Sequence, residues 1–191
     1  MARPRAFNES ELLQTVMVAF WRHGYGATTY RSLETMSGVG IRSLANTFGE
    51  KDELFTKALA HYRAFVAANL ANNFNPPSVD AIVRLFERVS SPADGDDPRR
   101  GGCLMVNTLF EIEQPPDAIA NEIAQYRDLF RHAFQQSLVA DNVADPETRA
   151  EFLIGVLWGA LSQIRLTKDT AAATPITTIV IETVRSWTPD N

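Results

Sequence analysis

The segment from Thr29 to Lys51 constrains the fold of this chain more than any other. Its apolar side chains recur at helical spacing and predict two short helices, at about residues 30–36 and 41–48. Gly38 stands where the first helix must end and Gly40 precedes the second, so a tight turn joins them. We expect five side chains to close a small core between the two helices: Leu33, Met36, Ile41, Leu44 and Phe48.

The second of these helices has a surface suited to entering a groove. Its remaining side chains face away from the small core and are mostly polar: Arg42, Ser43, Ala45, Asn46 and Thr47. A short helix with an apolar back and a hydrogen-bonding front is the geometry that a helix-turn-helix needs to enter the major groove of DNA.

Periodicity along the rest of the chain predicts an all-α fold of about nine helices. A capping box of Asn8 and Glu11, with a hydrophobic staple between Phe7 and Leu12, indicates the start of the first helix. The expected helices lie at about residues 9–23, 30–36, 41–48, 51–73, 78–89, 103–113, 118–139, 146–167 and 175–187.

Proline and aspartate mark two of these boundaries. Pro76 and Pro77 end the long helix 51–73, and Asp145 is expected to cap the helix that begins with Pro146. Threonine and isoleucine in the last segment favour a strand, but the sequence offers no partner strand, so we expect a helix there.

Charge is unevenly distributed along the chain. The net charge of −5 excludes a bulk nucleic-acid binder. Residues 1–51 nevertheless carry six basic and four acidic side chains, whereas the remainder carries twelve basic and nineteen acidic ones. The N-terminal quarter is therefore the part suited to phosphate, although so small a bias is also consistent with chance.

Cysteine usage and hydropathy predict a cytoplasmic protein that does not contact a membrane. The single cysteine, Cys103, excludes an internal disulfide and fits a reducing compartment. The N-terminus lacks an apolar stretch of the signal-peptide type. The longest apolar run, residues 152–166, is interrupted by polar side chains and is too short to span a bilayer.

The sequence contains no motif of an enzyme or a metal site. His23, His61 and His132 stand on separate helices without the spacings that metal sites use. There is no G-x-S-x-G motif and no phosphate-binding glycine loop, and the acidic residues at 94–97 lack the rest of a calcium loop. We therefore expect no catalytic residues, no metal and no cofactor.

The last two predicted helices carry more apolar surface than a monomer of this size easily covers. Trp158 and Leu161, with Gly155 and Gly159 permitting close backbone approach, predict a helix–helix contact with a second chain. The alternative is that these residues pack inside the monomer.

Three motifs carry a resemblance to a known family. The segment F-N-x-x-E-L-L-x-x-V-M-x-x-F-W-R-H-G-Y-x-A-T-T at residues 7–29, the two short helices after it, and F-G-E-K-D-E-L-F at 48–55 resemble the N-terminal domain of the TetR/AcrR family of transcriptional regulators. The similarity covers residues 3–62. A later motif, G-C-L-M-V-N at 102–107, is similar to the ligand-binding domain of one branch of that family.

The resemblance implies an organisation for the whole chain. Residues 1–50 would form a helix-turn-helix DNA-binding domain of three helices. Residues 51–191 would form an effector-binding and dimerisation domain, with helix 51–73 bridging the two. A homodimer would be held together by the last two helices.

The resemblance also implies contacts with a double-stranded DNA operator. Arg42 is the main candidate for a guanine edge, with a phosphate as its alternative partner. The helix starts near Tyr30 and Lys51 suit phosphates. Arg3 and Arg5 form either an arm that reaches DNA or a free tail. The candidate DNA-binding residues are Arg3, Arg5, Thr29, Tyr30, Arg42, Ser43, Ala45, Asn46, Thr47 and Lys51.

Ala45 departs from the family pattern. The family usually has a tyrosine at this position, which helps to hold the sugar-phosphate backbone, whereas alanine offers only an apolar contact such as one with a thymine methyl group. This difference predicts lower affinity or a greater reliance on Arg42.

An effector pocket in the C-terminal domain is also implied by the resemblance. Aromatic and sulfur side chains on different helices are candidates for holding a small, mainly apolar ligand, and Asn107 is a polar candidate. A core position is the commoner alternative for each. The candidate residues are Phe86, Cys103, Met105, Asn107, Phe110, Tyr126, Phe130, Phe134 and Trp158.

Cys103 has two interpretations. It follows two glycines and two arginines near a predicted helix start, and this setting favours a reactive thiolate. The interpretation that we favour is a buried thiol that behaves as a small apolar side chain.

Together these inferences predict a ligand-responsive DNA-binding regulator. The favoured form is a repressor that binds a pseudo-palindromic operator as a homodimer and is released by an effector. One alternative is a helical small-molecule-binding protein or enzyme whose N-terminal module no longer reads DNA, which Ala45 keeps open. The other is a regulator switched through the thiol of Cys103.

Overall fold

The computed structural model describes residues 8–188 of the 191-residue chain. Within this range the protein is all-α, as predicted, with short 3₁₀ helices at Pro98–Gly101 and Thr170–Ala173. The α-helices are α1 (Glu9–Ala27), α2 (Tyr30–Ser37), α3 (Ile41–Phe48), α4 (Lys51–Asn73), α5 (Val79–Ser90), α6 (Leu104–Glu111), α7 (Asp117–Ala140), α8 (Pro146–Thr167) and α9 (Thr174–Arg185).

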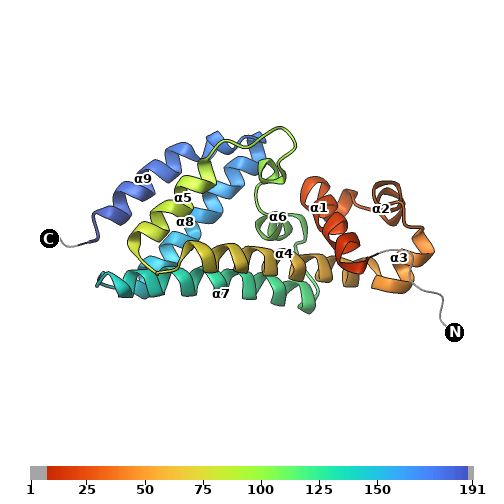
Figure 1. Cartoon of the computed structure of the whole chain (residues 1–191), viewed down its shortest axis with the longest axis horizontal. Coiled ribbons are helices and arrows are strands. Elements are labelled where there is room, and N and C mark those ends of the chain that lie inside the picture. Colours follow the sequence, from red (N-terminus) through yellow and green to blue (C-terminus); the bar gives the residue numbers. More distant parts are fainter. Residues whose placement is uncertain (1–7, 189–191) are drawn as a thin grey trace.

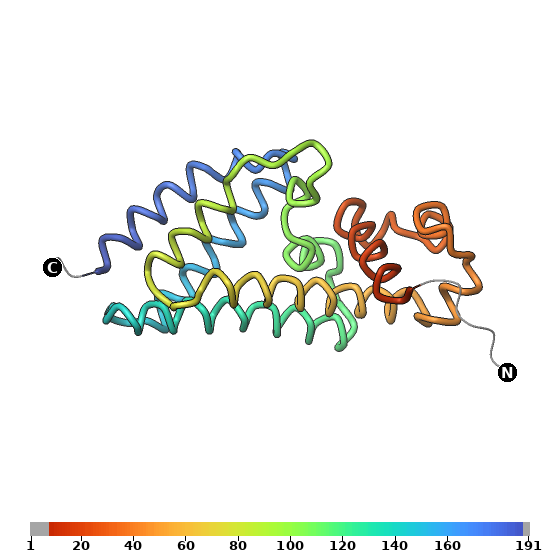
Figure 2. The backbone as a smooth tube through the Cα atoms, in the orientation of Figure 1, coloured from red at the N-terminus to blue at the C-terminus, as the bar shows by residue number. Residues whose placement is uncertain are grey.

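The helices form two groups joined by α4. In Figure 1, α1, α2 and α3 gather at one end, and α4 runs from them along the molecule side by side with α7. Helices α5, α8 and α9 form the opposite end, and α6 lies between the two groups. The tube in Figure 2 shows that α3 and α9 are at opposite ends of the molecule. No described helix is both long and apolar enough to cross a bilayer.

The start of α1 differs from the predicted capping box. The side chain of Asn8 caps the helix by accepting a hydrogen bond from the Ser10 amide at 3.0 Å. Glu11 does not reach back to the backbone but accepts a hydrogen bond from the Asn8 side-chain amide at 3.1 Å. The proposed staple involves Phe7, which lies outside the described residues. Near its other end α1 is interrupted at Gly24, where φ is 83°.

Two other local predictions hold in position and differ in detail. Asp145 is the N-cap residue of α8 and Pro146 follows it, as predicted, but the backbone of Asp145 is left-handed, with φ and ψ both 50°, and its side chain makes no capping bond. Cys103 is not the first residue of α6 but its N-cap, and the helix ends at Glu111 rather than near residue 113. Helix α9 forms as expected, because no strand is present among the described residues to pair with its threonines and isoleucines.

The predicted small core between α2 and α3 is only partly formed. Leu33, Leu44 and Phe48 are buried, whereas Met36 and Ile41 remain 43% and 39% exposed. The three buried side chains join one continuous apolar cluster that also contains residues of α1 and α4. Because these longer helices cover the same side of the motif, Met36 and Ile41 are left on its open side.

Candidate DNA-binding surface and internal cavity

The turn between α2 and α3 has the geometry of a helix-turn-helix. Helix α2 ends at Ser37 and is capped by Gly38, where φ is 70° and the amide donates to the Glu34 carbonyl at 2.9 Å. This left-handed conformation favours glycine. Gly40 is the N-cap residue of α3 and, as a glycine, has no side chain to cap the helix. Buried Leu44 and Phe48 fix one side of α3 against the core and therefore determine which side faces outward.

The outward side of α3 is open to solvent. Arg42, Ser43, Ala45 and Asn46 are exposed, and Thr47 is half-buried. Within the described part of the chain, no carboxylate pairs with Arg42. The guanidinium group is therefore free to bind an external acceptor.

The N-terminus of α2 is preorganised by a capping box. The Thr29 hydroxyl accepts from the Ser32 amide at 3.1 Å, and the Ser32 hydroxyl accepts from the Thr29 amide at 2.9 Å. Helix geometry leaves the amides of Tyr30 and Arg31 without an intrahelical acceptor. The Tyr30 hydroxyl donates to the Gly49 carbonyl at 2.5 Å, so its hydrogen is already in use. The part of Tyr30 that can donate to a phosphate is its amide.

Acidic side chains lie at the start of α3 and beside Lys51 in the chain. The Glu34 carboxylate accepts from the Ile41 amide at 3.1 Å and occupies the N-terminus of α3. The Lys51 ammonium lies 4.2 Å from the centre of the Tyr25 ring, next to Glu50 and Asp52 in the chain. Lys51 is half-buried, and these carboxylates reduce the positive potential that it presents to a phosphate.

The Tyr25 phenol belongs to the same junction between α1 and α4. Its hydroxyl donates to a carboxylate oxygen of Asp52. Burial, together with the hydrogen bond and the negative charge of Asp52, raises the pKa of Tyr25 to about 12. The remaining candidates, Arg3 and Arg5, lie outside the described residues.

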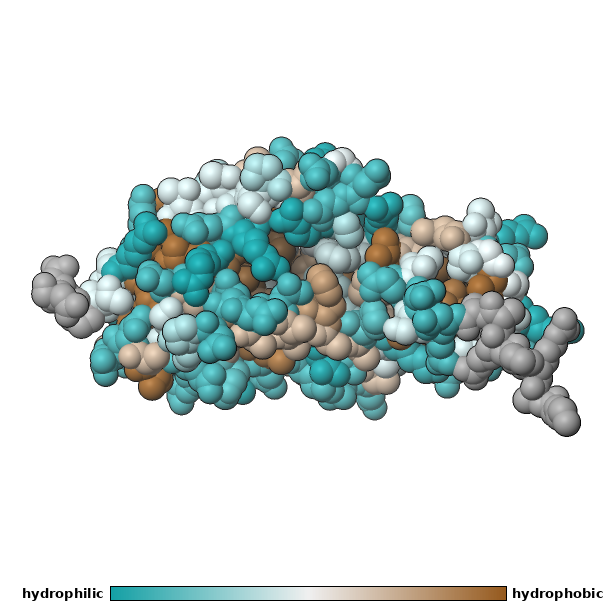
Figure 3. All heavy atoms as spheres, viewed as in Figure 1, coloured by the Kyte–Doolittle hydropathy of each residue, from teal (hydrophilic) through white to brown (hydrophobic). Residues whose placement is uncertain are grey.

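A cavity of about 150 Å³ lies at the other end of α4. Its walls come from α1, α4, α5, α7, α8 and the segment before α6. They are formed by Trp21, Tyr62, Phe65, Val66, Asn69, Leu70, Asn73, Leu85, Arg88, Val89, Arg99, Gly102, Cys103, Tyr126, Phe130, Leu157, Leu161 and Ile164. In Figure 3, hydrophobic side chains lie recessed among hydrophilic ones on the face between α4 and α5.

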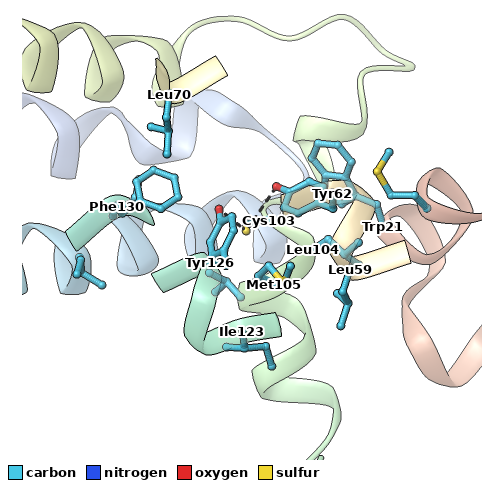
Figure 4. Packing of buried hydrophobic residues seen from close by; sticks show 14 of the residues in the cluster. Trp21, Leu59, Tyr62, Leu70, Cys103, Leu104, Met105, Ile123, Tyr126 and Phe130 are labelled. Carbon is cyan, nitrogen blue, oxygen red and sulfur yellow. Dashed lines mark hydrogen bonds between the residues drawn. The ribbon is translucent and has the colours of Figure 1, made fainter. Parts of the chain in front are cut away.

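Three neutral polar groups meet in the wall of this cavity. The Tyr62 hydroxyl donates to the Cys103 sulfur at 3.5 Å, and the Tyr126 hydroxyl is 3.1 Å from the same sulfur. Figure 4 shows this cluster with Phe130 and Leu70 on one side and Trp21 on the other. Burial raises the pKa of all three groups, although the hydrogen bonds from Tyr126 and Tyr62 act in the opposite direction on Cys103.

This environment matches the buried interpretation of Cys103. Within the described residues, neither of the two arginines that precede Cys103 in the sequence is among the groups that shift the pKa of its thiol. Arg99 instead pairs with the Asp97 carboxylate at 2.8 Å. Because burial dominates, the pKa of Cys103 is raised rather than lowered, and the thiol stays protonated at neutral pH.

The structure separates the nine sequence candidates for the ligand site. Cys103, Tyr126 and Phe130 line the cavity. Phe86, Met105 and Phe134 are fully buried in the core outside its lining. Asn107 is also buried, and its side-chain amide donates to the Gly101 carbonyl at 2.8 Å. Trp158 and Phe110 do not line the cavity either: Trp158 is half-buried and Phe110 is 77% exposed.

Trp21 is a cavity residue that the sequence did not indicate. It belongs to α1, within the helix-turn-helix end of the molecule, yet its indole N–H donates to the Gly102 carbonyl at 2.9 Å in the cavity wall. The only signal in the sequence is an apolar residue next to Phe20, out of register with the main buried face of α1. Trp21 can be buried on that side of α1 only if a second part of the chain packs there, and the sequence does not show which part does.

Glu111 forms another link between α1 and the rest of the protein. Its carboxylate accepts from the Tyr25 amide at 2.6 Å and pairs with Arg165 of α8 at 3.0 Å. The break in α1 at Gly24 allows this approach, since a Cβ atom there would collide with the carboxylate. The end of α1 is therefore attached to both α6 and α8.

Helices α8 and α9 form an apolar groove on the outside of the molecule. Its lining is almost entirely apolar: Phe152, Val156, Pro175, Ile176, Ile179, Val180 and Thr183. Phe152 and Ile179 remain 48% and 63% exposed. Gly155 and Gly159 are also exposed, and a Cβ atom at either would meet open space. Leu161, which we expected at a contact between chains, is half-buried and also lines the cavity.

The protein has an open helix-turn-helix, which one long helix joins to a lobe with a cavity. This is the architecture of a DNA-binding transcriptional regulator. A family model described as "Tetracyclin repressor-like, C-terminal domain" matches residues 78–180, more than half of the chain. The chain therefore belongs to the TetR family of transcriptional regulators.

Individual relatives agree with this assignment. The HTH-type transcriptional repressor ComR of Escherichia coli (strain K12) is 28% identical over 152 residues, which cover 78% of this chain and 70% of ComR. The structure of a cysteine mutant of CifR, a TetR family regulator, in complex with a 26-bp double-strand operator DNA is 26% identical. The two structures superpose with a TM-score of 0.78, and the alignment covers 97% of this chain and 100% of the CifR chain. A TetR regulator from Legionella pneumophila is 18% identical, with a TM-score of 0.79 over 94% and 98% of the two chains, and shares the fold.

Proposed function

We propose that this protein is a repressor that binds a pseudo-palindromic operator as a homodimer and is released by a small-molecule effector. The observation that carries the proposal is the open polar side of α3, with Arg42 free of any ion pair in the described part of the chain. The operator complex of CifR and the repressor name of ComR support the same function.

In this proposal α3 lies in the major groove. Arg42 binds a base edge, Ser43, Asn46 and Thr47 bind bases or phosphates, and Ala45 contacts a thymine methyl group. The free amides at the start of α2, with Lys51, hold the flanking phosphates. Residues 1–50 then act as the DNA-binding domain and residues 51–191 as the effector and dimerisation domain.

The groove between α8 and α9 is the proposed dimer interface. Exposed Phe152 and Ile179 give it the apolar character of a homodimer contact, and Gly155 and Gly159 allow close backbone approach. Two copies are needed because a single short helix contacts too few bases, whereas a two-fold dimer reads two half-sites about 34–36 Å apart.

The cavity is the proposed effector site, and Trp21 is the proposed link to DNA. A ligand in the cavity touches a side chain of α1 directly, without an intermediate helix. If the ligand prefers a state in which the Trp21–Gly102 hydrogen bond is altered, α1 shifts and the spacing of the two α3 helices changes. Glu111 transmits the movement to α8, where the dimer contact lies.

The test is a gel-retardation titration of the purified dimer against its own upstream region at several salt concentrations. We expect specific binding with a steep negative dependence on salt. Arg42→Ala should weaken binding by about thirtyfold or more, since each bidentate contact with guanine contributes about 1–3 kcal/mol and the dimer has two. Arg131→Ala on α7, which removes an exposed arginine far from α3, is the matched control. Binding without sequence preference, or equal effects of the two substitutions, would contradict the proposal.

A further inference from the structure

The polar groups that line the cavity are unbalanced in charge. Among the described lining residues, none is a carboxylate, whereas two are arginines, Arg88 and Arg99. Tyr62, Tyr126 and Cys103 add hydroxyl and thiol groups that stay neutral, because burial raises the pKa of each. The cavity therefore offers hydrogen-bond donors and positive charge, with no negative charge to receive a cation.

The two arginines differ in how far their charge is already neutralised. Arg99 pairs with Asp97 at 2.8 Å. Although burial by itself would raise the pKa of Asp97, the hydrogen bonds and charge of Arg99 lower it. Arg88 has no such partner among the described residues: its guanidinium only donates to the side-chain oxygen of Asn69 at 3.3 Å. Arg88 is thus the cation of the cavity lining whose charge is still available.

Arg88 also stands at the entrance of the cavity. It is an exposed residue in the last turn of α5, and its bond to Asn69 reaches across to α4. The deeper walls between α4, α7 and α8 are apolar, with Leu70, Phe130, Leu157 and Ile164. A ligand can therefore place an apolar body against these side chains while a charged end remains beside Arg88.

The size of the cavity limits that apolar body. A protein cavity of about 150 Å³ is large enough for one benzene ring. The net charge of the chain, −5, repels anions in general, so an anionic ligand needs a local cation to approach this surface. Arg88 supplies one at the entrance.

We propose that the effector is a small organic anion, with a body no larger than about one aromatic ring buried in the cavity and its carboxylate paired with Arg88. This inference rests on the proposed function, because it takes the cavity as the effector site. A neutral ligand of the same shape fills the same space but gains nothing from Arg88. An organic cation meets a positive charge and no carboxylate.

The test compares ligands that share a shape and differ in charge. Benzoate, benzamide and benzylammonium are titrated into the full-length protein by calorimetry, and hexanoate and hexanamide form a second pair. Arg88 remains exposed to water, so its gain is modest. We expect each carboxylate to bind about fivefold more tightly than its amide, and benzylammonium to bind most weakly.

Two variants determine whether Arg88 is responsible. Arg88→Gln should abolish the preference for the carboxylate and leave amide binding unchanged. Arg84→Gln should keep the preference, because Arg84 lies one turn earlier on α5, donates to the Asn73 carbonyl and is outside the lining. The two substitutions remove the same charge from the same helix. Thermal melting of both variants is measured in parallel, and we expect both to unfold at a temperature close to that of the natural protein.

The possible results separate this inference from the proposed function. Equal binding of carboxylate and amide, no binding of either carboxylate, or an unchanged preference in Arg88→Gln would overturn the anionic effector. Operator retardation without ligand is measured in parallel. A protein that binds its operator but does not prefer carboxylates refutes only this inference. A protein that prefers carboxylates through Arg88 but does not bind DNA refutes the repressor, and with it the effector role of the anion, but keeps the anion site.

Discussion

The outer side of α3 and the cavity in the other half of the molecule are prepared for their partners in opposite ways. On α3 one short helix presents polar side chains to solvent, and Arg42 makes no ion pair within the described residues. In the cavity, Tyr62, Cys103 and Tyr126 already bond to one another, and the walls come from five α-helices. DNA can therefore dock on side chains that already face solvent, whereas a ligand in the cavity lies against contacts that join several helices. This difference makes the cavity the suitable place for a switch.

The largest expected effect comes from deleting packing beneath each region. Leu44→Ala removes a fully buried side chain under α3, and Leu157→Ala removes one from the wall of the cavity. We expect Leu44→Ala to lower the free energy of unfolding by about 3 kcal/mol. Leu157 adjoins space that is already empty, so its loss should cost about 2 kcal/mol. Urea denaturation followed by circular dichroism measures both.

The two leucine variants should also differ in what they bind. Leu44→Ala should lose operator affinity, because Leu44 fixes the direction of the polar side of α3. Leu157→Ala should keep that affinity and accept a larger ligand. If both variants lost DNA binding equally at a temperature where both are folded, the two regions would not be separable.

The same contrast explains what the sequence could predict. Helices α3 and α4 begin and end at the predicted residues, since glycines flank α3 and a glycine and prolines bound α4. Such signals are local. The cavity depends on which helices meet, so Trp21 on α1 and Arg88 on α5 carried no mark of belonging to one site. Phe110 fitted an aromatic pattern but is exposed, because periodicity alone does not say which side of α6 is covered.

The roles of individual DNA-binding residues remain predictions. The structure places Arg42, Ser43, Ala45 and Asn46 together on the open side of α3. It also shows that the Glu34 carboxylate accepts a hydrogen bond from the Ile41 amide at the start of α3, which helix boundaries alone do not predict. Side-chain bonds to the backbone of a neighbouring helix, such as that of Glu34 to Ile41, depend on the tertiary fold.

An intermediate effect is expected at the hydrogen bond that joins the two regions. Trp21→Phe removes the indole N–H and leaves the buried Gly102 carbonyl without its partner, at a cost of about 2 kcal/mol in unfolding free energy. It should also weaken the release of operator by whichever carboxylate binds the cavity, because the link from the cavity wall to α1 is lost. Retardation with and without ligand measures this response.

Trp158→Phe is the matched control for that substitution. The indole N–H of Trp158 is buried but has no hydrogen-bond partner in the described part of the chain. Removing an unpaired donor should cost little, and less than about 1 kcal/mol is expected. An equal loss of stability in the two variants would show that the smaller ring, rather than the lost hydrogen bond to Gly102, accounts for the change in unfolding free energy.

The smallest effect concerns the pH dependence of stability. It tests whether the Cys103 thiol in the cavity wall is shielded from water. Burial raises the pKa of Cys103 above its ordinary value of 9.0, so the folded state holds the thiol proton more tightly than the unfolded chain. The resulting stability is fully present below the unfolded pKa and is lost as the pH rises through that value toward the folded one. Tyr62 and Tyr126 contribute in the same direction but at higher pH, because their ordinary pKa is 10.0.

Between pH 8.5 and 9.5 the unfolding free energy of Cys103→Ser should therefore fall by about 0.5 kcal/mol less than that of the natural protein. Identical slopes in urea titrations would mean that the thiol ionises in the folded state as easily as in water. In that case the cavity wall, like the surface of α3, would be open to solvent.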